Sequence, residues 1–149
     1  RYGEHLLDTI QKDMCNEDNS CCVLLADIDY FKTINDTHGH ALGDKVLQQV
    51  MHELSKNLRS KDTLIRWGGD EILIVLPSIK LDSALKMADR LRTVIESCKF
   101  PRIEEVTMSF GVVTWKRKEL KTSVLRRADE QLYLAKANGR NCIFPHSVP

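Results

Sequence analysis

Two pairs of acidic residues lie at the ends of apolar segments that are far apart in the sequence. Asp27 and Asp29 end the segment CCVLLADID. Asp70 and Glu71 follow two glycines and lead into the segment ILIVLP. Carboxylates are hard oxygen ligands, and a few of them in one site suit Mg²⁺, which completes its coordination with water and substrate phosphates. If the two segments are neighbouring strands, the acids converge, and the predicted chemistry is metal-assisted phosphoryl or nucleotidyl transfer.

Each acidic pair alone also has a plain structural explanation. Gly-Gly-Asp is a common hairpin turn, and an acid at the end of a strand often only faces solvent. Between the pairs lies the segment YFKTINDTHGHALGD, which is too polar for a core element and is predicted to be a functional loop with helical turns. The two pairs together with this segment favour a shared functional site.

The spacing of apolar residues predicts helices and strands that alternate along the chain. A polar loop is expected at 16–20, and the segments 62–67 and 71–77 are expected to pair as a hairpin across Gly-Gly-Asp. The strand at 106–115 is expected to be able to turn back on itself, and Asn138 and Gly139 are expected to end the last helix, with Gly139 as a left-handed cap. The predicted helices cover 1–14, 42–58, 81–98 and 123–139, and the predicted strands cover 21–29, 62–67, 71–77, 106–115 and 142–145.

This order of elements predicts an α/β (α+β) sandwich, in which a mixed central sheet is flanked by helices. A length of 149 residues fits one domain, and the sequence contains no internal repeat or linker. Because the chain starts inside a helical pattern without a capping residue, we expect residues 1–149 to be a single domain and an N-terminally truncated fragment of a longer protein.

The composition is that of an ordinary globular protein. Hydrophobic residues make up 42% and charged residues 29% of the chain, which excludes disordered, collagen-like and disulfide-rich classes. A net charge of +1 argues against nucleic acid or a membrane surface as a partner held by bulk charge. The five cysteines lack zinc-ligand spacing and are expected to be reduced thiols of a cytoplasmic domain. A membrane-anchored parent with this domain on the cytosolic side stays open.

Four segments carry a resemblance to a known family. ADIDYFKTINDTHGHALGD, RWGGDEILIVLP, VTMSFGVV and ADEQLYLAKANGRN follow one another as in the GGDEF domain family, the diguanylate cyclases, and the similarity runs from about residue 1 to 141. Ile72 replaces the usual phenylalanine of the signature, Trp67 stands where tyrosine is common, and the block that normally precedes RY is absent. We expect these departures to affect packing and rate, because none of them removes a ligand contact.

The resemblance implies a palm-like sheet, related to polymerases and nucleotidyl cyclases, and a reaction in which two GTP molecules condense to cyclic di-GMP with release of two pyrophosphates. It further implies a homodimer whose protomers each hold one GTP, two Mg²⁺ or Mn²⁺ ions per half-site, and an upstream sensor domain. It implies metal ligation by Asp27, the Ile28 carbonyl, Asp70 and Glu71. Asp70 is also the family's usual base, although a carboxylate on Mg²⁺ is a weak one. We favour a structural role for Asp29.

The resemblance also implies residues that bind the nucleotide. Asn35 and Asp44 would read the guanine edge, and His40 would support the pocket. The phosphates would be held by Tyr30, Phe31, Lys32, Lys136 and Arg140. Simpler explanations remain open: Phe31 as a core residue, His40 as a loop brace, Asn35 and Asp44 as turn and helix-start residues, and the two C-terminal cations as partners of a helix end.

The segment RSKD lies five residues before GGDE and resembles the family's inhibitory product site. Arg59 and Asp62 would bind cyclic di-GMP there, because arginine stacks on purines and pairs with guanine or phosphate in bidentate fashion. Arg90 would supply a second cation. Taken alone, RSKD is also compatible with an ordinary helix end. Three functions therefore remain: a competent cyclase, a catalytically inactive module that binds GTP or cyclic di-GMP, and a structural dimerisation domain.

Overall fold

The computed structural model describes residues 2–16 and 20–148. Five helices and five strands are present in this part of the chain. Within it, no helix has the length and apolar character needed to cross a membrane. The elements are α1 (Tyr2–Asn16), β1 (Cys21–Ile28), α2 (Phe31–His38), α3 (His40–Lys56), β2 (Thr63–Gly68), β3 (Glu71–Pro77), α4 (Leu81–Ser97), β4 (Met108–Trp115), α5 (Lys121–Ala137) and β5 (Ile143–Phe144).

The strands form one mixed sheet in the order β2-β3-β1-β4-β5. β1 lies in the centre and pairs antiparallel with both β3 and β4, while the short β5 pairs parallel with β4. Every residue of β1 is buried, as expected for a central strand covered on both faces. The predicted mixed sheet flanked by helices is confirmed.

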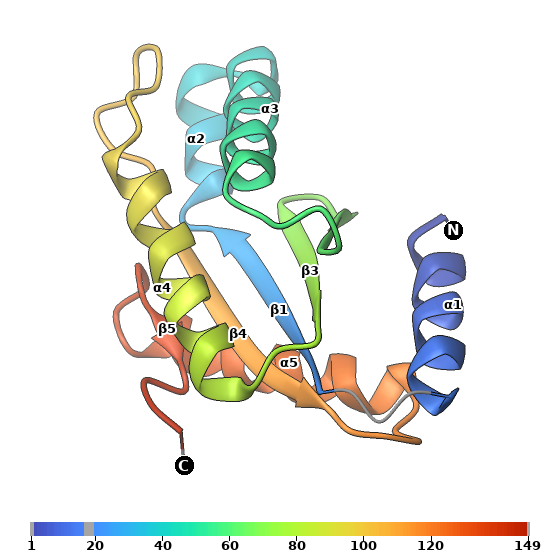
Figure 1. Ribbon diagram of the computed structural model, residues 1–149. Coiled ribbons are helices and arrows are strands. Elements are labelled where there is room, and N and C mark those ends of the chain that lie inside the picture. The colour runs from blue at the N-terminus through green and yellow to red at the C-terminus, as the bar shows by residue number, and fades with distance from the viewer. Residues whose placement is uncertain (1, 17–19, 149) are drawn as a thin grey trace.

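Helices cover both faces of the sheet (Figure 1). Alternate side chains of β1 point to opposite faces because the strand has a two-residue period. Cys22, Leu24 and Ala26 pack in one core with residues of α2, α3 and α4. Cys21, Val23 and Leu25 belong to a second core with residues of α1 and α5. In Figure 1, α4 crosses in front of the sheet and α5 lies behind it.

The expected hairpin is present. β2 and β3 pair antiparallel, with an irregularity between Arg66 and Gly68 that precedes the turn. Ile72, the unusual residue of the signature, is fully buried in the first core, as expected. Gly139 has a φ of 103°, so the predicted left-handed cap after α5 is confirmed.

Two of the predicted elements are wrong in detail. The polar segment at 30–44 is helical rather than a loop with helical turns, because Phe31, Ile34 and Gly43 are buried while the polar residues face outward. β4 is a continuous strand and does not turn back. The polar loop expected at 16–20 lies largely in 17–19, outside the described residues.

Candidate active site

The two acidic pairs meet at one end of the sheet. β1 and β3 are neighbours, and their register places Asp27 directly opposite Glu71. Asp70 belongs to the turn between β2 and β3, immediately before Glu71. The antiparallel pairing therefore brings together acids that are more than forty positions apart in the sequence.

Asp27 is buried, with 6% of its surface exposed. Its Oδ2 accepts a hydrogen bond from Lys136 Nζ of α5, and its Oδ1 is buried without a hydrogen-bond partner among the described residues. Burial and the neighbouring Asp70 carboxyl raise the pKa of Asp27 to about 8, against the opposing effect of Lys136. A buried oxygen without a partner costs free energy, so this carboxylate is suited to a further cation or donor.

Glu71 is half-buried and points to the same side of the sheet. Burial is the largest cause that raises the pKa of Glu71. The like charge of Asp129 on α5 adds to the increase, and Lys136 opposes it. The site is therefore short of positive charge when only protein groups are counted. That imbalance favours a divalent cation among these carboxylates.

The oxygen donors at this end of the sheet fit the hard cation that the sequence predicts. In the described ranges, no group of three or more His, Cys, Asp or Glu side chains is arranged so that it could hold a metal ion by itself. Mg²⁺ does not need one, because it usually keeps several waters and uses one or two carboxylates with substrate phosphates. The partnerless Oδ1 of Asp27 is the observation that supports the fit.

Asn35 and Asp44 are brought together by a close contact between α2 and α3. Gly43 is buried, and a Cβ added to it would lie 1.8 Å from Asn35 Oδ1. The Asn35 amide therefore lies directly on the backbone of the residue before Asp44. Asp44 lines a groove of about 450 Å³ together with Leu47, Gln48, Met51 and Arg66. The groove has room for a planar base between α3 and the hairpin.

Cationic and backbone donors lie beside the start of α2. The Arg140 guanidinium carbon is 4.7 Å from the centre of the Tyr30 ring, and Tyr30 is largely exposed. Lys32 is exposed in the first turn of α2, where backbone N–H groups lack intrahelical partners. These groups and Lys136 could hold an anion between β1 and the end of α5.

The comparisons with known proteins agree with this geometry. Residues 1–142 match the family described as "Diguanylate cyclase, GGDEF domain". The chain belongs to the GGDEF domain family. It is 38% identical to response regulator PleD of Caulobacter vibrioides over 96% of the chain and 33% of PleD. It is 42% identical to diguanylate cyclase DgcP of Pseudomonas aeruginosa over 77% of the chain and 18% of DgcP. The chain thus spans a third or less of these two relatives.

Solved structures share the fold of this GGDEF domain. The GGDEF domain of DgcB from Caulobacter crescentus, in complex with c-di-GMP, has a TM-score of 0.83 and 29% identity, covering 91% of this chain and 85% of that one. The GGDEF-only form of PA1120 (TpbB or YfiN) from Pseudomonas aeruginosa has a TM-score of 0.86 and 28% identity, covering 95% and 85% of the two chains. The palm-like fold is therefore confirmed.

The remaining predicted substrate residues differ in their surroundings. The Phe31 side chain is buried in the first core, so any ligand contact from this residue would have to come from its backbone. His40 is exposed at the first residue of α3. Ile28 is buried at the end of β1 beside Met108. The structure thus supports the core role of the Phe31 side chain that the sequence left open.

The RSKD segment forms a tight ion pair. Arg59 Nε and Nη2 donate to Asp62 Oδ1 at 3.0 and 2.7 Å, and the Asp62 side chain is fully buried. Arg59 Nη2 also donates to the Pro77 carbonyl at 2.9 Å. Arg90 Nη2 of α4 donates to the Asn57 carbonyl at 2.7 Å, two residues before Arg59. The three predicted residues therefore gather where α3, β3 and α4 meet, away from the carboxylates.

Sequence reasoning missed three residues that shape the site. Gly43 permits the contact with Asn35. A Cβ at Gly111 would lie 2.4 Å from the Ala128 carbonyl oxygen, so α5 rests on β4 through backbone atoms. Arg66 donates to the Gly69 carbonyl at 3.0 and 2.8 Å and so braces the turn before Asp70. A glycine inside a predicted strand was a signal for close backbone approach, and it applied to Gly111.

Proposed function

We propose that this GGDEF domain is a diguanylate cyclase, which condenses two GTP molecules into cyclic di-GMP and two pyrophosphates. The observation that carries the proposal is the buried, partnerless Oδ1 of Asp27 beside Asp70 and Glu71. A module that only binds a nucleotide gains nothing from an expensive buried carboxylate of this kind.

Asp27, Asp70, Glu71 and the Ile28 carbonyl would hold two Mg²⁺ or Mn²⁺ ions in each half-site. When bound, these ions supply charge stabilisation to the reacting phosphate and lower the pKa of the attacking hydroxyl. The protein groups then keep defined tasks. The strands hold the carboxylates rigidly, and Gly69 leaves the turn free of a side chain where the nucleotide must approach.

The nucleotide would lie across the end of the sheet. Asp44 accepts from N1–H and N2–H of guanine, and Asn35 meets the remaining edge atoms. Lys136, Arg140, Lys32 and the first N–H groups of α2 neutralise the β- and γ-phosphates. Lys136 would have to shift from Asp27 toward the phosphates as the metal neutralises that carboxylate. This exchange keeps the local charge balanced.

Two protomers would complete the reaction. The 3′-hydroxyl on one protomer attacks the α-phosphate held by the other, so that one P–O bond forms as the bond to pyrophosphate breaks. The proton of the hydroxyl passes to a nearby base, for which Asp70 is the candidate, or to water. Repeating the step from the second protomer closes the ring. The active unit is therefore a homodimer.

Product inhibition at Arg59, Asp62 and Arg90 is part of the proposal. Support comes from the DgcB structures, which are complexes with c-di-GMP, and from the clustering of the three residues. Because PleD and DgcP are much longer than this chain, we also propose that a sensor domain in the parent protein controls dimerisation. SiaD of Pseudomonas aeruginosa, a similar structure, is in complex with its activator SiaC. We also propose a cytoplasmic location for the domain, because its proposed substrate GTP is cytosolic.

The test is turnover measured on a form whose dimerisation is verified. The chain, fused to a dimerising coiled coil, is incubated with Mg²⁺ and GTP, and cyclic di-GMP and pyrophosphate are quantified by chromatography. Production of both in a 1:2 ratio is expected. Asp36→Asn, a change to an exposed acid on α2, serves as the matched control for changes to Asp70. GTP binding without turnover by the verified dimer would instead support the inactive binding module.

A further inference from the structure

The Asp29 carboxylate joins three segments of the chain. It is 4% exposed, and it lies two residues beyond Asp27. Oδ1 accepts from Ser109 Oγ at 2.7 Å, and Oδ2 accepts from Thr107 Oγ1 at 2.7 Å and from the Asn141 backbone N–H at 2.9 Å. The two hydroxyls come from β4 and the residue just before it, whereas Asn141 follows α5. The third donor therefore ties the end of α5 to the end of β1.

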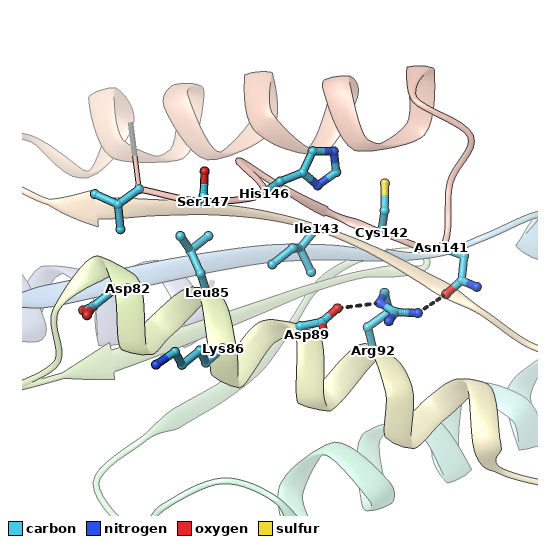
Figure 2. Close-up of a pocket in the computed structure, with 11 residues that line it drawn as sticks. Asp82, Leu85, Lys86, Asp89, Arg92, Asn141, Cys142, Ile143, His146 and Ser147 are labelled. Atoms are coloured by element: carbon cyan, nitrogen blue, oxygen red, sulfur yellow. Dashed lines mark hydrogen bonds and ion pairs between the residues drawn. The ribbon is translucent and has the colours of Figure 1, made fainter.

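Asn141 is held on its side chain as well as on its backbone. Its Oδ1 accepts from Arg92 Nη1 of α4 at 3.0 Å, as Figure 2 shows, and its Nδ2 donates to Glu96 Oε2. Arg140 and Asn141 have φ values of 61° and 44°. Residues other than glycine rarely adopt this left-handed conformation, and it persists only where surrounding contacts determine it. The bonds to Asp29, Arg92 and Glu96 are such contacts.

The consequence of this arrangement falls on Arg140. Arg140 precedes Asn141, and Tyr30 follows Asp29, so the two residues that meet in the cation–π contact are chain neighbours of the two ends of one hydrogen bond. Tyr30 also has a positive φ, of 57°. The bond from Asn141 to Asp29 thereby sets the distance between the Arg140 guanidinium and the first turn of α2.

We propose that Asp29 is a positioning residue for triphosphate binding, which acts by holding Arg140 over the start of α2. The inference rests on the proposed function, because Arg140 matters only if a nucleoside triphosphate binds there. Asp29 itself does not contact the ligand: all three of its hydrogen bonds described above are to protein groups. A purely structural Asp29 would instead stabilise the fold without favouring any part of the nucleotide.

A pocket lies beside this junction. It has a volume of about 670 Å³ and lies between α4 and the C-terminal segment, with Arg92 and Asn141 at one end (Figure 2). Its charged groups are of both signs, and nothing in it selects one class of ligand. The pocket leaves the Arg92–Asn141 contact accessible from one side.

The experiment compares two nucleotides that the protein cannot convert. Calorimetry in Mg²⁺ measures the Kd of 3′-deoxy-GTP, which lacks the attacking hydroxyl, and of GMP, which lacks the β- and γ-phosphates. Asp29→Ala should weaken 3′-deoxy-GTP binding by about tenfold, the lower range for a lost charged hydrogen bond, and GMP binding by less than about twofold. Arg140→Ala should do the same. The double variant should lose no more than either single one.

Two further variants separate positioning from stability. Asp29→Asn should retain the wild-type preference for the triphosphate. The oxygen of the new amide can accept from the Asn141 N–H, and its NH₂ can donate to Ser109. Ser109→Ala removes one partner of Asp29 but leaves Asn141 bonded, and it should leave the ratio of the two Kd values unchanged. If Asp29→Ala does not fold, Asp29→Glu, which displaces both oxygens by one methylene, is measured on the same ratio.

The outcomes distinguish the inference from the proposed function. Equal weakening of both nucleotides by Asp29→Ala, or losses that add in the double variant, would overturn the positioning role while leaving nucleotide binding intact. An unchanged ratio in the folded Asp29→Glu protein, where that variant is needed, would overturn it too. If the unmodified chain binds neither nucleotide, the proposed function and the inference fall together.

Discussion

Lys136 Nζ donates a hydrogen bond to Oδ2 of Asp27, while Oδ1 of the same carboxylate is buried without a partner in the described part of the chain. One half of the carboxylate is thus neutralised by an ammonium that lies 109 positions away in the sequence. The other half lies buried beside the Asp70 carboxyl, and burial and this neighbour both raise the pKa of Asp27. Asp27 is therefore the group whose charge state should respond most to a bound cation.

Binding of Mg²⁺ should depend on pH through Asp27. Its pKa is about 8 in the folded chain, above an ordinary value of about 4. The protonated group therefore contributes stability below about pH 4, and this contribution is lost as pH rises to about 8. Because Mg²⁺ requires the ionised form, its apparent affinity should fall by about tenfold for each pH unit below 8. Thermal unfolding with and without Mg²⁺ between pH 6 and 9 measures this.

The control for that titration is Asp27→Asn, which cannot ionise. It should unfold with the same dependence on pH whether or not Mg²⁺ is added. An increase in stability on adding Mg²⁺ that has the same size at pH 6 and pH 9 in the unmodified chain would contradict the assignment of Asp27 as the titrating ligand.

Gly43→Ala should impair base recognition without unfolding the domain. The new Cβ would overlap Asn35 Oδ1, which must turn away. Alanine favours a helix over glycine by about 0.5–1 kcal/mol. This gain offsets the cost of displacing the Asn35 side chain, so the unfolding free energy should hardly change. We expect GTP binding to weaken by about tenfold, and ATP binding to change little. Calorimetry with both nucleotides tests this. A further loss when Gly43→Ala is added to Asn35→Ala would show that Gly43 acts through another group.

Substitutions at Asp70 and Arg59 should separate catalysis from inhibition. Asp70→Ala should lower turnover by at least about a hundredfold and leave cyclic di-GMP binding unchanged.

Arg59→Ala should relieve product inhibition with turnover retained, but it leaves the buried Asp62 without its ion-pair partner. Arg59→Lys keeps a positive charge there and loses the bidentate geometry, so it is the safer companion. Initial rates at increasing product concentration measure the turnover and the product inhibition of each variant. Unaltered inhibition in either Arg59 variant would make RSKD a helix end only.

Glu119→Gln should destabilise the connection between β4 and α5. Burial alone would raise the pKa of Glu119, but the bonds from Arg127, Ser123 and the Lys116 N–H outweigh it and lower the pKa to about 2. The ionised group therefore stabilises the fold above about pH 4.5, and this contribution is lost as pH falls to about 2. The substitution should cost roughly 1–3 kcal/mol at pH 7 and less at pH 3, as measured by urea unfolding. Glu104→Gln, at an exposed site, is the control; an equal cost at both pH values would contradict the ion-pair explanation.

Local patterns were sufficient for much of the fold. The continuous apolar run of β1, the Gly-Gly-Asp turn and the cap at Gly139 each follow from a few consecutive residues, and all three agree with the structure. The helix at 31–38 and the first turn of α3 were harder to predict, because few of their residues are buried and the polar majority resembles a loop; the apolar spacing at 42–58 did predict the rest of α3. Tertiary packing decides such segments, because it buries Phe31 and Ile34 whatever their neighbours are.

The candidate site required contacts that no local pattern contains. The approach of Asn35 to Gly43 depends on how α2 packs against α3, and the bond between Lys136 and Asp27 depends on α5 resting on Gly111. The resemblance to the GGDEF family named Lys136 and Asp27, but as phosphate and metal ligands rather than as partners of each other. Asp29 was expected to be structural, and its bond to the Asn141 backbone could not be read from side-chain types.

The two layers of helices contribute different parts of the proposed nucleotide site. Asn35 and Asp44 belong to helices that pack on one face of the sheet, whereas Lys136 belongs to α5 on the other face. A ligand that reaches both groups must pass over the end of the central strand β1. It would therefore brace the two layers, in addition to the bonds that join Arg92 and Glu96 of α4 to Asn141 after α5. Slower amide hydrogen exchange in α2 and α5 together, on addition of GTP but not of guanosine or pyrophosphate alone, would be the signature of that bracing.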